Sequence, residues 1–253
     1  MTSLTDLKAA LDALLRVREI TDYSGAVNGL QFQNGSGKVV RFLAAVDASL
    51  PVIRKAAALP GPSLLLVHHG LFWSGAQPVT GAVFEKYAAA MQADLAIYSS
   101  HLPLDVHPEL GNNVLLAAAL ELGPTVPFFD CKGMKLGVRA TVDLSRAELT
   151  DRLSRAVGGA VHVCPGGPER VRGVGVITGG AGSEIAAVAA TGVDTFITGE
   201  GPHWSYPAAE EAGVNLLYGG HYATETFGVK ALAARLSEIY GLPWEFIDHP
   251  TGL

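Results

Sequence analysis

The stretch that decides the fold is residues 40–73, VRFLAAVDASLPVIRKAAALPGPSLLLVHHGLFW. Two short apolar runs, residues 42–46 and 64–67, flank an alanine-rich segment of helical character at 50–59. Apolar runs of this length are typical of buried strands, and the order strand–helix–strand favours parallel pairing within an α/β layer. The segment therefore predicts an α/β fold.

The same alternation continues along the chain. We predict further strands at residues 95–98, 136–142, 161–164, 173–177, 195–198 and 214–218. We predict helices at residues 83–93, 146–157, 183–190, 205–212 and 224–240. Leucines at helical spacing also predict an amphipathic N-terminal helix, with Ser3 as its cap, in place of a signal peptide.

An internal repeat supports two related halves. Residues 40–73 align without a gap onto residues 171–204 at a constant offset of 131. Seven positions are then identical in the two segments: Val40, Arg41, Ala56, Ala58, Gly61, Gly70 and Trp73 meet Val171, Arg172, Ala187, Ala189, Gly192, Gly201 and Trp204. We therefore predict two pseudo-repeated α/β halves packed around a shared cleft, because open α/β sheets bind ligands at the carboxyl ends of their strands.

Proline and glycine clusters suggest where these halves begin and end. Pro124 and Pro127 precede a predicted β-α-β unit, and the turn PGGP at residues 165–168 follows it. The predicted organisation is an N-terminal α/β half at 1–123, a connecting unit at 124–170, and a C-terminal α/β half at 171–253 that completes the cleft.

Composition limits the functional classes. The chain has a formal net charge of −6 and no apolar run long enough to span a membrane, so we expect no membrane partner, and nucleic-acid binding is disfavoured without being excluded. Its two cysteines, Cys131 and Cys164, form no CxxC motif. A reducing, cytoplasmic environment is the simpler expectation, with both thiols acting as small apolar groups.

Histidines and carboxylates gather where the predicted strands end. His68 and His69 follow the run at 64–67, and two adjacent imidazoles can serve two neighbouring metal ions. Taken alone, the pair is equally compatible with one packed and one exposed histidine of no shared purpose.

Two further motifs favour the metal interpretation. His101 precedes Asp105 by four residues, and His221 precedes Glu225 by the same spacing. Imidazole and carboxylate are the usual ligands of zinc, iron and manganese, and two neighbouring dications need the negative charge that carboxylates supply. We therefore predict that the two pseudo-repeated α/β halves pack around a shared dinuclear metal cleft, with the C-terminal half completing the metal site. The alternative for His221 and Glu225 is an ordinary helix start capped by Thr224.

Four ordered motifs resemble the Nif-three-like dinuclear-metal family, also called GTP cyclohydrolase one, type two homologue. They are VNGLQ at 27–31, HHGLFW at 68–73, SHLPLD at 100–105 and GHYATE at 220–225. The resemblance implies that His68, His69, Asp105, His221 and Glu225 bind two divalent ions of zinc, iron or manganese, with Glu225 bridging them. It also implies that His101 lies near the metals without binding them, and that the protein forms a homo-hexamer with sites facing an internal cavity.

These features lead to two functional hypotheses. The first is a metal-dependent hydrolase acting on a small nucleotide-like or phosphorylated substrate, with His101 as the catalytic group that moves a proton. The alternative is a non-enzymatic, metal-binding oligomeric scaffold or regulator that binds protein or nucleic acid.

Several other residues receive weaker interpretations. The GGAG run at 179–182 favours a tight strand-to-helix connection over a phosphate cradle, because it lacks the lysine and spacing of a P-loop. Glu200 and His203 are expected to line the metal cleft, Asn28 and Gln31 to shape a pocket or stabilise a turn, and Trp73 and Trp204 to be core or interface anchors.

Overall fold

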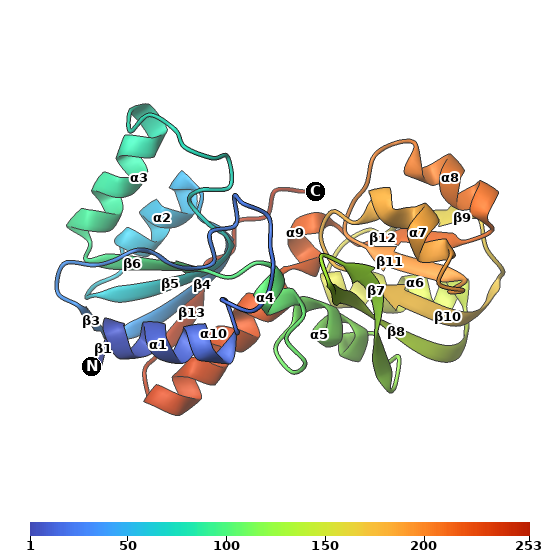
Figure 1. Cartoon of the computed structure of the whole chain (residues 1–253), viewed down its shortest axis with the longest axis horizontal. Helices are drawn as coiled ribbons and strands as arrows, with labels where there is room; N and C mark the ends of the chain where they lie inside the picture. Colours follow the sequence, from blue (N-terminus) through green and yellow to red (C-terminus); the bar gives the residue numbers. More distant parts are fainter. The chain divides into compact units, whose positions relative to one another are not determined.

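A computed structural model describes residues 1–253, and the chain divides into two compact units. The first unit comprises residues 1–104 and 228–249, and the second comprises residues 105–227 and 250–253. Each unit contains its own α/β layers (Figure 1). The α/β class and the pseudo-repeated halves are thus confirmed.

The first unit is built on a five-stranded sheet of order β13-β4-β5-β6-β2. Four strands are parallel and β2 is antiparallel to β6. The strands are β2 (Gly29–Phe32), β4 (Arg41–Asp47), β5 (Ser63–His69), β6 (Leu95–Ser99) and β13 (Trp244–Phe246); the short pair β1 (Thr2–Ser3) and β3 (Lys38–Val39) lies outside this sheet. The helices are α1 (Leu4–Leu14), α2 (Leu50–Ala57), α3 (Gly81–Gln92) and most of α10 (Thr226–Tyr240), with α4 (Leu102–Asp105) at the unit boundary.

Alternating side chains on these strands explain the two helical layers of the first unit. Leu43, Leu65 and Ile97 pack in one cluster with residues of α2 and α3. Figure 1 shows α2 and α3 on one face of this sheet and α1 and α10 on the other. The strands therefore read as continuous apolar runs, since both faces are covered.

The second unit is built on a six-stranded sheet of order β7-β8-β10-β11-β12-β9. Parallel pairing is confined to two neighbouring pairs, β10 with β11 and β11 with β12, and the other pairs are antiparallel. The strands are β7 (Thr125–Cys131), β8 (Met134–Ser145), β9 (His162–Pro165), β10 (Arg170–Val176), β11 (Thr195–Thr198) and β12 (Asn215–Tyr218). The helices are α5 (Asn112–Ala119), α6 (Arg146–Val157), the 3-10 turn η1 (Gly182–Glu184), α7 (Ile185–Ala189), α8 (Ser205–Ala212) and α9 (His221–Thr224).

The repeat is visible in the connections of the two units. β4, α2, β5, α3 and β6 occur in the same order as β10, η1–α7, β11, α8 and β12, and each set places its three strands side by side in parallel. The strands and helices predicted from the sequence fall on these elements within a few residues of their ends.

The structure divides the chain at positions other than the predicted borders. Both predicted borders, after residues 123 and 170, lie inside the second unit. The reason is that β8 pairs with β10 and β9 pairs with β12, which joins the predicted connector to the later sheet. The end of the chain differs too, because β13 pairs with β4 in the first unit.

The hydrogen bonds that cap helices give a prediction about stability. Ser145 caps α6, and its Oγ accepts a hydrogen bond of 3.0 Å from Glu148 N. We expect Ser145→Ala to lower the free energy of unfolding by about 1 kcal/mol, because this bond is lost. Urea titration of both variants measures the effect. Thr80 precedes α3 without a side-chain cap bond, so Thr80→Ala should lower the free energy of unfolding by less.

Candidate metal centre

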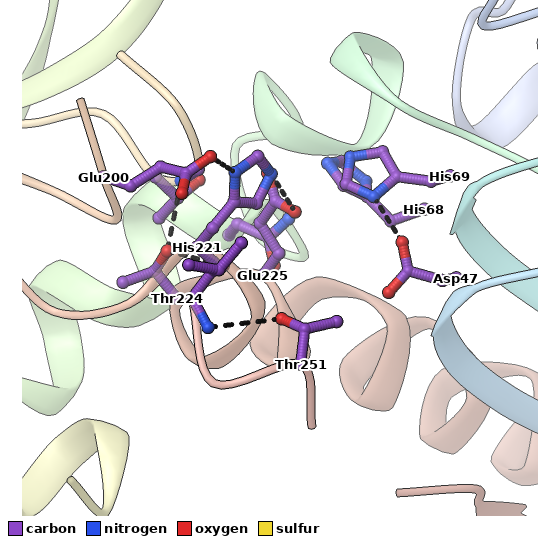
Figure 2. A network of polar contacts seen from close by, with 12 residues as sticks. Asp47, His68, His69, Glu200, His221, Thr224, Glu225 and Thr251 are labelled. Atoms are coloured by element: carbon purple, nitrogen blue, oxygen red, sulfur yellow. Dashed lines mark hydrogen bonds and ion pairs between the residues drawn. The ribbon is translucent and has the colours of Figure 1, made fainter. Parts of the chain in front are cut away.

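Two histidines lie at the carboxyl end of β5 in the first unit. His68 is fully buried, and its Nδ1 lies 3.0 Å from the carbonyl oxygen of Ser100. His69 Nδ1 lies 2.9 Å from Asp47 Oδ1, at the end of neighbouring β4 (Figure 2). The two ring centroids are 4.9 Å apart. Since an oxygen meets Nδ1 of each ring, Nε2 is the nitrogen oriented for metal coordination.

A third histidine joins this pair. His101 follows β6, and its ring centroid lies 4.8 Å from that of His68 and 5.6 Å from that of His69. Ligand atoms of the three imidazoles lie within 4.8 Å of one another, so this group could hold a metal ion. The structure thus brings together the three histidines that the sequence singled out in the first unit.

Asp22 holds His101 and was not predicted. Its Oδ1 lies 2.9 Å from His101 Nδ1, while its Oδ2 accepts from Leu102 N at 2.9 Å and Asn28 Nδ2 at 2.8 Å. Burial raises the pKa of Asp22, but the bonds from His101 and Asn28 outweigh it and hold the pKa below its ordinary value. An ionised Asp22 favours the proton on His101 Nδ1 and leaves Nε2 as the basic nitrogen.

Asn28 and Gln31, predicted to shape a pocket or stabilise a turn, hydrogen-bond to the backbone around these histidines. Asn28 Oδ1 accepts a hydrogen bond from His101 N at 2.8 Å. Gln31 Oε1 accepts from Leu71 N at 2.6 Å, and a methyl group on Gly70 would meet the Gln31 amide at 2.3 Å. Gly70 therefore allows the turn after β5 to pack directly on Gln31.

The second unit places one histidine between two carboxylates. His221 opens α9, with Nδ1 2.8 Å from Glu200 Oε1 and Nε2 3.1 Å from Glu225 Oε2 (Figure 2). Glu225 is only 3% exposed. Asp105 is also buried, and its Oδ1 accepts from Asn112 Nδ2 at 2.8 Å. Each of these side chains is thus fixed by at least one polar partner.

The charge of His221 depends on these neighbours. Burial lowers its pKa, but hydrogen bonds and charge interactions with Glu225 and Glu200 outweigh burial and raise the pKa to about 9. At neutral pH the metal-free protein therefore carries a proton on His221.

This proton gives a pH prediction. A metal ligand must be a neutral imidazole, so binding at His221 has to displace the proton. We expect proton release on metal binding below pH 9, and an affinity that rises with pH by up to about tenfold per unit. Calorimetry in buffers of different ionisation enthalpy measures the release. Glu200→Gln should lower the His221 pKa and reduce the release at pH 8, whereas an unchanged release would contradict this account.

A glycine allows Glu225 its position. Gly179 has a φ of 71°, and a Cβ there would lie 2.1 Å from Glu225 Oε1. Its carbonyl oxygen accepts from Gly199 N and Glu200 N at 2.8 and 3.0 Å. Residues 179–182 join β10 to η1, which agrees with the interpretation as a tight connection.

The remaining predicted residues have mixed outcomes. Glu200 contacts His221 as described, while His203 is exposed. Trp73 and Trp204 are 42% and 53% exposed, so neither is a core anchor of its unit. Cys131 and Cys164 form no disulfide. None of the helices is long and apolar enough to cross a bilayer.

Comparisons with known proteins assign the family. A family model described as Duf34/NIF3 (NGG1p interacting factor 3) matches residues 2–251. A relative from Deinococcus radiodurans, named "GTP cyclohydrolase 1 type 2 homolog", is 45% identical over 245 residues, covering 96% of this chain and 92% of that protein. A protein of the same name from Escherichia coli is 37% identical, with 97% and 98% covered.

Solved structures agree. A crystal structure of a Thermus thermophilus protein superposes with a TM-score of 0.90 at 37% sequence identity, and all of both chains is covered. The family match, the relatives and the fold all extend over nearly the full length of the chain. The chain therefore belongs to the Duf34/NIF3 family.

Proposed function

We propose that the protein is a metal-dependent hydrolase acting on a small nucleotide-like or phosphorylated substrate. Two divalent ions would be held by His68, His69, Asp105, His221 and Glu225, with Glu225 as the bridge. The observation that carries the proposal is that His69 and His221 each have Nδ1 against a carboxylate, at 2.9 and 2.8 Å, which directs Nε2 toward a ligand role.

The donor set fits such ions. Three imidazoles and two carboxylates form a mixed nitrogen and oxygen set, which suits zinc, iron or manganese. Asp105 and Glu225 are buried carboxylates, and burying a charge is costly unless an opposite charge compensates it. When bound, a pair of divalent ions lowers the pKa of water and stabilises developing negative charge.

The chain itself supplies the proton transfer. His101 is 8% exposed and close to His68, with Nδ1 held by Asp22. Its Nε2 is therefore the nitrogen that takes a proton from the attacking water or gives one to the leaving group. Asp22 acts through His101 and is a positioning residue.

The test is turnover by the metal-loaded protein. We would screen zinc-, iron- and manganese-loaded samples against phosphomonoesters, phosphodiesters and nucleotides, including guanosine triphosphate because of the name its relatives carry. Glu225→Gln keeps the size of the side chain but removes its charge, so we expect it to abolish metal-dependent turnover while assembly stays intact. Absence of turnover across the panel, together with selective binding of a protein or nucleic acid, would favour the scaffold alternative.

We further propose a homo-hexamer in the cytoplasm, on the basis of the family resemblance. Light scattering on the purified chain tests the assembly directly. A monomeric mass at micromolar concentration, with metal present, would contradict it.

A further inference from the structure

A cavity in the second unit, separate from the residues assigned to metal binding, has the character of a ring-binding pocket. It measures about 800 Å³, within the roughly 300–1,000 Å³ of small-molecule sites. Its walls are formed by strands β9 and β12, the loop between β11 and α8, the first turn of α8 and residues 252–253. The side chains that matter for recognition are His162, Glu200, Pro202, His203, Tyr206 and Tyr218.

Aromatic faces dominate one wall. Tyr218 and His162 are directly opposite each other on β12 and β9, with ring centroids 6.2 Å apart and planes inclined by 19°. Tyr206 lies 5.8 Å from His162 at 51°. Neighbouring rings of this kind offer flat surfaces on which another planar group can stack.

The Tyr218 ring is held in place from its hydroxyl end. The Tyr218 hydroxyl donates to Ser205 Oγ, and Ser205 Oγ donates in turn to the Pro202 carbonyl oxygen at 2.5 Å. Ser205 is fully buried. Tyr218 therefore contributes its ring to the cavity, while its hydroxyl is used within the protein.

The charge of the lining selects against an anion. No lysine or arginine lines the cavity, and Glu200 is its one acidic side chain. Glu200 is 40% exposed and meets His221 through Oε1, and a carboxylate can accept several hydrogen bonds. A ligand that carries N–H groups suits this end, and no lysine or arginine is present to hold a phosphate.

We propose that this cavity binds a planar heteroaromatic ring bearing N–H groups, such as a nucleobase, stacked on the His162 and Tyr218 wall with its N–H edge at Glu200. Glu200 touches both the cavity and His221, so the ring lies beside a proposed metal ligand. The inference rests on the proposed function only for the role of His221. It places the ring of a nucleotide-like substrate here and its phosphate elsewhere.

Binding can be tested without metal. Chelator-treated protein is titrated with guanosine, adenosine and uridine, and with ribose and inorganic phosphate as controls, while the ring-proton NMR signals of His162, Tyr206 and Tyr218 are followed. We expect saturable shifts with at least one nucleoside and none with ribose or phosphate. His162→Ala should weaken binding by at least about fivefold, because a stacking surface is lost.

A matched variant controls for loss of a ring elsewhere. Phe84 is 57% exposed on α3 of the first unit, so Phe84→Ala should leave binding unchanged. Absence of saturable shifts in the wild-type protein, or equal weakening by both variants, would overturn the inference. Turnover without nucleoside binding would contradict the ring-binding cavity and support the hydrolase. Nucleoside binding without turnover would support the cavity and contradict the hydrolase.

Discussion

Asp22→Asn is expected to reduce turnover of whichever substrate the metal-loaded protein hydrolyses by about 10²-fold or more, the usual contribution of a general acid or base. Asp22 Oδ1 faces two donors, Tyr23 N at 2.6 Å and His101 Nδ1, and Oδ2 faces Leu102 N and Asn28 Nδ2. An asparagine must therefore turn its NH2 toward a donor in either orientation. Asn28 cannot relieve this by flipping, because its Oδ1 accepts from His101 N.

The matched variant is Asp47→Asn. Asp47 holds His69 with the same geometry, but His69 is a proposed metal ligand and His101 is not. We expect Asp47→Asn to weaken metal affinity by about 10–100-fold, and Asp22→Asn to leave metal content unchanged. Nitrogen NMR shifts of the His101 ring report its tautomer. Normal turnover by Asp22→Asn, with the proton still on Nδ1, would exclude the positioning role.

The second large effect is expected from one methyl group at Gly179. An alanine there must adopt a φ of 71°, which costs about 1–2 kcal/mol, and its Cβ would collide with Glu225 Oε1. Glu225 is buried and has little room to move away. We expect Gly179→Ala to lower both the free energy of unfolding and the metal affinity, the latter by more than about tenfold.

A variant at Gly213 separates the effect of backbone strain from the effect of the collision with Glu225. The φ of Gly213 is 68°, and no atom lies within 4 Å of the position of its missing Cβ. Gly213→Ala therefore carries the backbone strain without the collision, and should destabilise the protein while its metal titration stays normal. Equal metal affinity in the two variants would show that Glu225 does not need its observed position.

The pattern of apolar residues predicted those strands that are buried on both faces. The strands of both repeats are apolar on both faces, so β4, β5 and β11 were evident as short buried runs. β7 was not, because its burial is irregular and Phe129 has a φ of 64°. The sequence also did not predict to which unit α10 belongs, since the amphipathic pattern of a helix does not specify which sheet it covers.

The sequence likewise predicted some residues of the candidate site and missed others. Histidines and carboxylates that follow strands were found by residue type and spacing. Asp22 was missed because it lies in an irregular loop, 79 positions from His101, and carries no motif of its own. Only the folded chain shows that this carboxylate accepts from four donors.

The return of the chain to its first sheet has a consequence for biosynthesis. β13 pairs with β4, yet the ribosome makes these strands about 200 residues apart, near opposite ends of the chain. Until residues 244–246 emerge, β4 exposes an unpaired apolar edge of the kind that invites aggregation. The nascent protein therefore has to protect an incomplete sheet during most of its translation, and chaperone dependence should be greatest in that interval.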